Sequence, residues 1–342
     1  MNEDPNSAFY LYGFTRSDLV PNETASQPPQ TARISPSAPG CIKLGVAGIL
    51  PAVSGGFQPP GRGPGAFSSG ETPDPTPTES ELDAALPSAP GTRIAEVAGI
   101  DEQRPPFLWC HGDSSAILSL VAREEFCGPA ADSNLQDLAW VGPRVCQHQA
   151  VLEQARHFAP ILPARFGTLF SSIEALARFM DQHQAAIADF LERVAGQEEW
   201  AVKGLLDRAR AEDALCRQML AKDQAPLASS PGLAYMQEQR LRIKARQELE
   251  DCLAGVCRVL LEELTPLVSE TCQRQVLSRE TTGADQEMVF NWAFLVPQGA
   301  VADFQKRVEE ANTSRTLPGL TFAVSGPWPP YSFCPALEVE PA

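Results

Sequence analysis

Nine cysteines and four histidines are the side chains with the widest range of chemistry in this chain of 342 residues. A zinc site needs four ligands at short spacings, usually with a Cys-x-x-Cys pair, and the sequence contains no such pair. On a helix, residues two apart face different sides, so Cys146 and His148 cannot point at one ion. We therefore predict no metal site and interpret these residues as ordinary buried or surface side chains. The nearest approaches to a ligand set are Cys110-His111, Cys146-Gln-His148 followed by His157, and Cys252-x4-Cys257.

Motifs for other kinds of catalysis are also missing from the sequence. Gly-x-Ser-x-Gly, which presents a nucleophilic serine on a tight turn, does not occur. Neither a Walker A loop nor Gly-x-Gly-x-x-Gly, whose glycines let the backbone approach a phosphate, is found. His148, His157 and His183 fall on predicted helices, where an exposed or hydrogen-bonded histidine is the ordinary interpretation. The sequence predicts neither catalytic residues nor a cofactor.

One basic cluster occurs in this acidic chain, at Arg240, Arg242, Lys244 and Arg246. Arg240 and Lys244 share one face of the predicted helix, and Arg242 and Arg246 share another, because residues four apart are neighbours on a helix. A solvated helix face is the favoured interpretation, and a docking patch for an acidic partner is the alternative. Such a patch would suit a protein better than DNA, since the rest of the chain is acidic.

Arg165 and an aromatic segment near the C-terminus are further candidates. Arg165 is the single charge in the apolar stretch Leu162-Pro-Ala-Arg-Phe-Gly-Thr168, and such a charge is normally paired or binds an anion. We expect a buried ion pair that stabilises the fold. Trp328 and Tyr331 belong to the rigid segment Gly326-Pro-Trp-Pro-Pro-Tyr-Ser-Phe333. That segment either seals a core or forms an exposed docking surface, and the sequence leaves both open.

Charge and hydropathy restrict the partners and the compartment. A net charge of −16 and a pI near 4.7 argue against nonspecific binding to nucleic acid or to an anionic membrane. The most apolar stretch, residues 42–53, is interrupted by Lys43 and Pro51, so no run is long enough to span a bilayer. The first residues lack the basic and apolar regions of a signal peptide, and we interpret the cysteines as reduced thiols. The sequence predicts a cytoplasmic protein.

A proline-rich segment interrupts the first half of the chain. Residues 9–14 are aromatic and predict a strand. Residues 20–92 are rich in Pro, Gly, Ser and Thr, and such a composition buries too little apolar surface to offset the entropy lost on ordering. Because the strand before this segment needs sheet partners, we interpret it as a disordered insertion within the first domain.

Strands and helices are predicted on both sides of residue 198. In the first half we expect strands at 107–110 and 116–121, a helix at 134–158 and an extended segment at 160–170. A second helix, capped by Ser171 or Ser172, is expected to run to about Val194 and to close at Gly196. In the second half we expect a strand at 200–206, a long helix after Gly232, a strand at 288–296, a helix at 301–308 and a strand at 320–324. The last three elements predict a right-handed βαβ unit.

These elements predict an α+β protein of two domains, each a small sheet with helices packed on one face in a ferredoxin-like arrangement. The predicted boundaries are 1–19 with 93–197 for the N-terminal domain, 20–92 for the insertion, 198–334 for the C-terminal domain and 335–342 for a tail.

Seven segments occur in an order that is more specific than any one of them. They are Tyr10-Leu-Tyr-Gly13, Trp140 to Val151 with Pro143-Arg144 and His148, Leu162 to Phe170, Gly196 to Lys203, Pro231 to Tyr235, Asn291 to Pro297, and Gly326 to Phe333. In this order they resemble the gas vesicle protein L/F family. The resemblance covers Trp140 to Phe333, with a weaker fit over 93–125, and the proline-rich insertion departs from the compact family pattern.

The resemblance implies a two-domain α+β protein that is a minor component of gas vesicles in the cytoplasm. It implies no catalysis and no cofactor. Its partners would be the small hydrophobic shell protein and other gas vesicle accessory proteins, with neither nucleic acid nor membrane. Its role would be to assist nucleation or to limit premature aggregation of the shell protein.

Two alternatives come from other classes. An enzyme or small-molecule sensor built on ferredoxin-like domains would need a pocket with converging polar groups around Arg165 and His148. A general adaptor would use the proline-rich segment as a peptide ligand, and deletion of residues 21–90 would then abolish partner binding.

Overall fold

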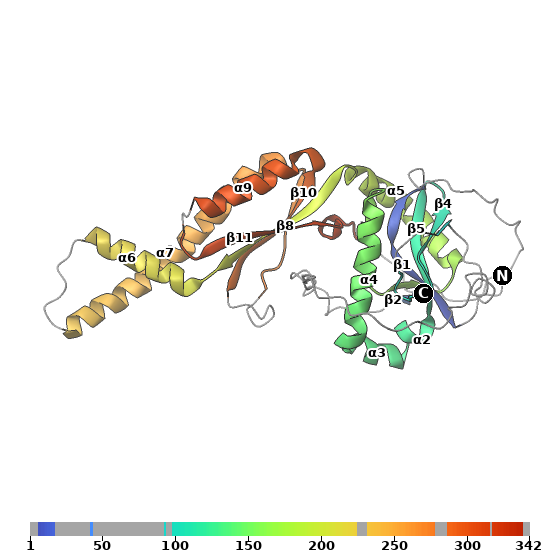
Figure 1. The fold of residues 1–342 in the computed structure, drawn as a ribbon, viewed down its shortest axis with the longest axis horizontal. Helices are drawn as coiled ribbons and strands as arrows, with labels where there is room; N and C mark the ends of the chain where they lie inside the picture. Colours follow the sequence, from blue (N-terminus) through green and yellow to red (C-terminus); the bar gives the residue numbers. More distant parts are fainter. Residues whose placement is uncertain are drawn as a thin grey trace, which may run out of the picture.

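The computed structural model describes residues 6–17, 42–43, 92–93, 98–223, 231–277, 286–314 and 317–337. Apart from 42–43 and residue 92, the predicted insertion at 20–92 lies outside these ranges, as do residues 338–342 of the predicted tail. The described residues form an elongated molecule with two antiparallel sheets and packed helices (Figure 1). The predicted α+β class is therefore confirmed.

The N-terminal sheet is built around β1 (Ser7–Arg16), the strand predicted at residues 9–14. β5 (Ser114–Ala122) pairs with one side of β1, and β6 (Ile161–Pro163) and β7 (Thr168–Phe170) pair with the other, all antiparallel. The strand order is β2-β7-β1-β5-β4-β3, with β6 beside β1. The outer strands are β2 (Ile42–Lys43), β3 (Thr92–Arg93) and β4 (Phe107–His111).

Helices cover both faces of this sheet, so the predicted covering of one face is wrong for the N-terminal half. Phe9 and Leu11 of β1 pack on one face with a helix after β7, while Tyr10 and Tyr12 pack on the other with helices that precede β6. The physical reason is that consecutive side chains of β1 are all apolar or aromatic, and a strand of that kind must be buried on both sides. The element order is also not that of a ferredoxin-like unit. The helices are α2 (Arg123–Phe126), α3 (Pro129–Gln136), α4 (Leu138–Arg156) and α5 (Ile173–Arg193).

The helix predicted at 134–158 is divided at Asp137. The Asp137 side chain accepts a hydrogen bond from the backbone N–H of Ala139 at 2.9 Å and so caps the start of α4. The next predicted helix was placed well: Ser172 caps α5, and Gly196 follows it with φ of +68°.

A bulge in β1 directs Phe14 to the same face as Phe9 and Leu11. The register with β5 shifts between Leu11 and Gly13, so β1 has one extra residue at this point. The extra residue turns the Phe14 side chain to the face that Phe9 and Leu11 occupy. A Cβ at Gly13 would lie 2.6 Å from the carbonyl oxygen of Leu162, so only glycine fits at this crossing of β1 and β6.

The C-terminal sheet has the order β11-β8-β10-β9, with every neighbouring pair antiparallel. The predicted βαβ unit is present in split form, because β8 lies between β10 and β11. The short strand β9 was not predicted. The strands are β8 (Gln197–Leu206), β9 (Glu270–Gln273), β10 (Glu287–Pro297) and β11 (Leu320–Trp328).

Helices α7 and α9 cover one face of this sheet. Leu260 and Leu264 of α7 and Phe304 of α9 are buried against Val202 and Phe294 of the strands. The predicted long helix after Gly232 and the predicted helix at 301–308 are thus present. The helical segments are α6 (Arg208–Asp223), α7 (Pro231–Leu264), α9 (Val301–Thr313), and the short turns η2 (Thr265–Leu267), η3 (Gln298–Ala300) and η4 (Tyr331–Phe333).

The two sheets share one core through α5. Ile187 and Phe190 of α5 lie in the same buried cluster as Ala293 and Leu295 of β10. At the end of α5, the Arg193 guanidinium pairs with the carboxylate of Glu270 in β9 at 2.6 and 2.7 Å. The halves are therefore joined by a packed junction rather than by a free linker.

Candidate partner-binding surface

Helix α6 and the first half of α7 form a hairpin that projects away from both sheets, while the second half of α7 covers the C-terminal sheet (Figure 1). The sides that face each other are apolar, with Leu215 and Met219 of α6 buried beside Ala245 of α7. Ile243 lies two residues before Ala245, and Met236 lies nine residues before it. At about 3.6 residues per turn, both positions are on the opposite side of the helix from Ala245. Both side chains therefore point away from α6, and they are 59% and 54% exposed.

The predicted basic cluster lies exposed along α7. Arg242 pairs with a glutamate of its own helix at 2.9 Å, and Arg246 pairs with a glutamate of α6 at 3.3 Å. Arg240 and Lys244 form no ion pair with any residue that the structure describes. Arg240 stands four residues after Met236 and three before Ile243, so it lies between them on the helix surface. The solvated-face interpretation suits the two paired arginines and leaves two cations open to a partner.

Arg165 is exposed, so the predicted buried ion pair is wrong. It lies in the tight turn between β6 and β7, where its carbonyl oxygen accepts from the N–H of Thr168 at 3.1 Å and from the Thr168 hydroxyl at 2.7 Å. Gly167 takes a φ of +81° in the same turn. The turn presents the guanidinium to water, which solvates the charge, and none of the described residues forms an ion pair with it.

The C-terminal aromatic segment is held by contacts within the chain. Trp328 is half-buried at the end of β11, and its Nε1 donates to the hydroxyl of Ser325 at 3.3 Å. Tyr331 is 37% exposed, and its hydroxyl donates to the side-chain oxygen of Gln149 in α4 at 3.4 Å. Phe333 is buried in the core that α5 shares with both sheets. Of the two alternatives left open by the sequence, the segment fits the sealing tail, and Tyr331 keeps part of its surface accessible.

A buried ion pair that the sequence analysis missed anchors this segment. Glu199 of β8 is fully buried, and its carboxylate accepts from the Arg274 guanidinium and from the N–H and hydroxyl of Ser332, both at 2.9 Å. Burial raises the pKa of the Glu199 carboxyl, while Arg274 and Ser332 oppose that rise by favouring the carboxylate. The partners are far apart in sequence, so no spacing motif marks them. The available signal was a glutamate directly before the apolar run Trp200-Ala-Val202 of β8.

His148 is buried in α4 against the tyrosines of β1. The ring stacks on Tyr12 with centroids 5.5 Å apart, and the Tyr10 hydroxyl lies 2.9 Å from Nδ1. The Tyr10 oxygen also accepts from the N–H of Gly167 at 3.1 Å, so Tyr10 links the His148 ring to the turn between β6 and β7. No residue in the described ranges forms a hydrogen bond with Nε2. Burial lowers the pKa of His148 to about 4, opposed only in part by the backbone of Ala164, so the ring is neutral and structural.

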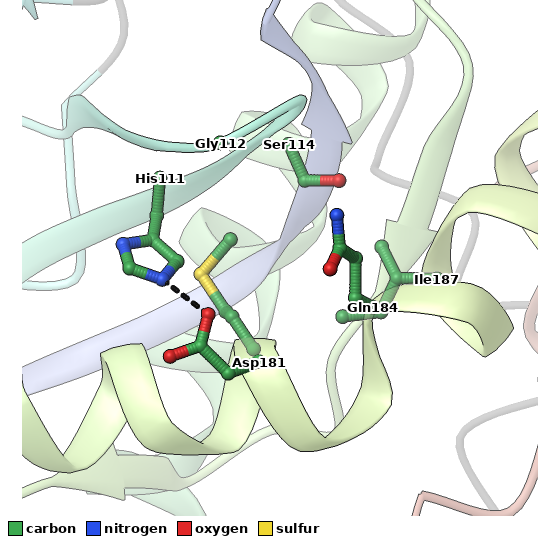
Figure 2. Close-up of a pocket in the computed structure, with 7 residues that line it drawn as sticks. His111, Gly112, Ser114, Asp181, Gln184 and Ile187 are labelled. Carbon is green, nitrogen blue, oxygen red and sulfur yellow. Dashed lines mark hydrogen bonds and ion pairs between the residues drawn. The ribbon is translucent and has the colours of Figure 1, made fainter.

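A small hollow lies between the β4–β5 turn and α5. Figure 2 shows the His111 ring directed at Asp181, with Nε2 and Oδ1 2.7 Å apart, and Ser114 directed toward Gln184 and away from that ring. The hollow has a volume of about 50 Å³, far below the roughly 300–1,000 Å³ of sites that bind small molecules. With its aspartate 68% exposed, the pair is a surface hydrogen bond rather than part of a Ser-His-Asp triad.

A second hollow of about 260 Å³ lies between η2 and α9 and is lined by Leu267, Asp303, Lys306, Arg307 and Glu310. Neither hollow includes Arg165 or His148. Within the described ranges, three or more potential metal ligands are nowhere grouped together. No helix there combines the length and the hydropathy needed to cross a bilayer.

The model of the family described as gas vesicle synthesis protein GvpL/GvpF matches residues 72–335, which is most of the chain. The chain belongs to the GvpL/GvpF family. Gas vesicle protein L of Streptomyces sp. (strain CB03234) is 26% identical over 239 residues, which cover 69% of this chain and 85% of that protein. Gas vesicle protein F of Dolichospermum flosaquae is 27% identical over 192 residues, which cover 54% of this chain and 75% of that protein.

Solved GvpF structures have a similar fold. The crystal structure of GvpF from Anabaena sp. PCC7120 aligns with a TM-score of 0.51 at 20% identity, over 70% of this chain and 91% of that one. GvpF from Microcystis aeruginosa aligns with a TM-score of 0.50 at 16% identity, over 72% of this chain and 96% of that one. At these identities the comparison establishes the fold, and the family match establishes the relationship.

Proposed function

We propose that this GvpL/GvpF protein takes part in gas vesicle formation by binding the small apolar shell protein before and during its assembly. The observation that carries the proposal is the family match over residues 72–335. Bound to the shell protein, the chain would keep it dispersed or help it to nucleate. The protein would act at the gas vesicle and in the cytoplasm, together with other gas vesicle proteins.

The physical need for such a partner follows from the shell protein itself. A small apolar subunit exposes strand edges and apolar patches until it is assembled, and such surfaces associate indiscriminately. A partner that covers them prevents this association. The net charge of −16 supports the same task, because a strongly charged complex resists further aggregation.

Exposed apolar side chains of the second half are the candidate contacts for this partner. Those of the α6–α7 hairpin are more accessible than the aromatic segment at the C-terminus, where Trp328 is half-buried and Tyr331 is 37% exposed. We therefore propose the hairpin as the main contact and Tyr331 as a secondary one. Trp328 is assigned a structural role.

The proposal includes the absence of catalysis. An enzyme or sensor would need a concave site with converging polar groups, and the polar pair at His111 borders only a hollow of about 50 Å³. In the second hollow, of about 260 Å³, Lys306 and Arg307 already pair with Glu310. Neither hollow includes Arg165 or His148, around which the rival function was expected.

Co-purification tests the proposal. The chain and the shell protein, expressed together with an affinity tag on this chain alone, should elute as one complex, and the purified complex should not hydrolyse nucleotides. Elution of the tagged chain without shell protein would refute the binding role. Hydrolysis of a nucleotide by the purified chain, with no hydrolysis by a catalytically inert family member purified in the same way, would refute the absence of catalysis.

A further inference from the structure

The outer face of α7 is an apolar surface with two open cations. It is defined by Met236, Arg240 and Ile243, which lie on the side of α7 turned away from α6, and by Lys244 on the flank beside them. Resting on the proposed function, we infer that this face docks an amphipathic helical segment of the shell protein whose apolar side is bordered by carboxylates.

Charge complementarity identifies the chemistry of the occupant. Residues 212–247, the distal part of the hairpin together with the glutamate that pairs with Arg246, contain six Lys or Arg and four Asp or Glu, a local net charge of +2 in a chain of net charge −16. The basic residues are Arg217, Lys222, Arg240, Arg242, Lys244 and Arg246, and the acidic residues are Glu212, Asp213, Asp223 and Glu238. A second copy of the hairpin would bring like charges together, whereas an acidic segment would be attracted.

The unpaired cations lie where a docked helix would need them. Arg240 is placed between Met236 and Ile243, and Lys244 lies one turn beyond Arg240. Carboxylates that flank the apolar side of a docked helix would meet both cations. Arg242 and Arg246 already have glutamate partners, Glu238 and Glu212, and are not required.

The apolar pair matches the way in which amphipathic helices are recognised. Met236 and Ile243 are seven residues apart, two turns along one face, and each is more than half exposed. Anchors at this spacing are typical of helix-to-helix docking. Tyr235, 62% exposed, extends the accessible apolar surface at the start of the same stretch.

The outer face is not needed to hold the hairpin together. The helices of the hairpin pack through Leu215, Met219, Ala245, Leu249 and Leu253 on their inner sides. Substitutions on the outer face should therefore leave the fold intact, which circular dichroism and the melting temperature can verify for each variant.

The experiment measures binding of the full chain to the shell protein at low and moderate salt. Met236→Ser with Ile243→Ser should weaken binding by at least about tenfold, because the apolar anchors are lost. Arg240→Glu with Lys244→Glu should weaken it by a similar factor, and the loss should be larger at low salt. A photoreactive side chain at position 243 should cross-link to the shell protein.

Matched controls lie elsewhere on exposed helix surfaces. Val259→Ser removes a 46% exposed apolar side chain from the same helix, and Arg258→Glu with Lys306→Glu changes the net charge by the same amount as the test pair. All three substitutions should leave binding within about twofold of wild type. A photoreactive side chain at position 259 should not cross-link.

The outcomes separate this inference from the proposed function. Wild-type binding that the outer-face variants retain would overturn the docking site and leave the proposed function standing. Failure of the wild-type chain to bind would refute the proposed function, and the inference with it. If the outer-face substitutions changed the oligomeric mass of the chain in solution and left shell-protein binding unaltered, the outer face would be a contact with a second copy of the chain. That result would also overturn the inference.

Discussion

Acidification from pH 7 to pH 4 should weaken the fold through His148. The ring is 3% exposed between the tyrosines of β1, with no described hydrogen-bond partner for Nε2, so a positive charge there would be poorly solvated. The unfolded chain offers the same ring free access to water. Protons therefore bind the unfolded chain more readily and shift the equilibrium toward it.

The size of the effect follows from the pKa. Burial lowers the pKa of His148 from 6.5 to about 4, a difference of about 2.5 pH units at about 1.4 kcal/mol each. Above pH 6.5 neither state holds the proton and the contribution is constant. Between pH 6.5 and 4 the unfolded state gains a proton that the folded state does not, so the free energy of unfolding falls by ~3 kcal/mol. Below pH 4 both states are protonated and the loss is complete.

Urea unfolding monitored by tryptophan fluorescence between pH 7.5 and 4 measures this contribution. Glutamine at position 148 can still accept from Tyr10 but cannot be protonated, so His148→Gln should be less stable than wild type at pH 7 and should lose ~3 kcal/mol less on acidification. His157, exposed at the end of the same helix, supplies the control, and His157→Gln should keep the wild-type pH dependence. Parallel curves for wild type and His148→Gln would refute the reasoning.

Three further substitutions test other parts of the fold. Glu199→Ala leaves the largely buried Arg274 without its carboxylate and should lower the free energy of unfolding by about 3–5 kcal/mol in urea titrations, whereas a loss below about 1 kcal/mol would mean that the pair is not structural. Arg165→Ala should change the melting temperature very little, because the side chain is exposed, and a large decrease would indicate a buried partner. Asn312 covers the outer edge of β11 with two hydrogen bonds to the backbone of Phe322, at 2.7 and 2.8 Å. Asn312→Ala should therefore increase self-association in light scattering after size exclusion, and an unchanged mass would contradict the protective role of this side chain.

Elements with strong local signals were predictable from the sequence. Helix α5 has a capping serine, a regular apolar stripe and a closing glycine, and its predicted ends agree with the structure to within a residue or two. The long strands β1, β8 and β10 were found from their apolar and aromatic content. Strand β9, with four residues of mixed polarity, gave no signal above that of a loop.

Features that depend on distant contacts were not predictable in the same way. Burial of both faces of β1 could have been inferred from its continuous run of apolar and aromatic residues, Phe9-Tyr-Leu-Tyr12, but the helices that cover each face could not. The partners of Glu199 meet only after the strand register of the second sheet is known. Arg165 was misplaced because its apolar neighbours suggested burial, whereas the turn closed by Gly167 exposes it.

The candidate surface was partly visible in the sequence. The basic cluster at Arg240 to Arg246 was identified, together with its division between two sides of the helix. The sequence alone does not indicate that the neighbouring apolar residues Met236 and Ile243 face outward. Only the packing of α6 against α7 shows this. Which cations are already neutralised also depends on Glu212 of the neighbouring helix.

Light scattering of the shell protein, with and without this chain, tests the central claim most directly. Shell protein diluted from denaturant should scatter increasingly with time as it aggregates. A stoichiometric excess of the wild-type chain should delay and reduce that increase, while an equally acidic unrelated protein should not. Unchanged scattering in the presence of the wild-type chain would contradict the proposed role, even though membership of the GvpL/GvpF family would stand.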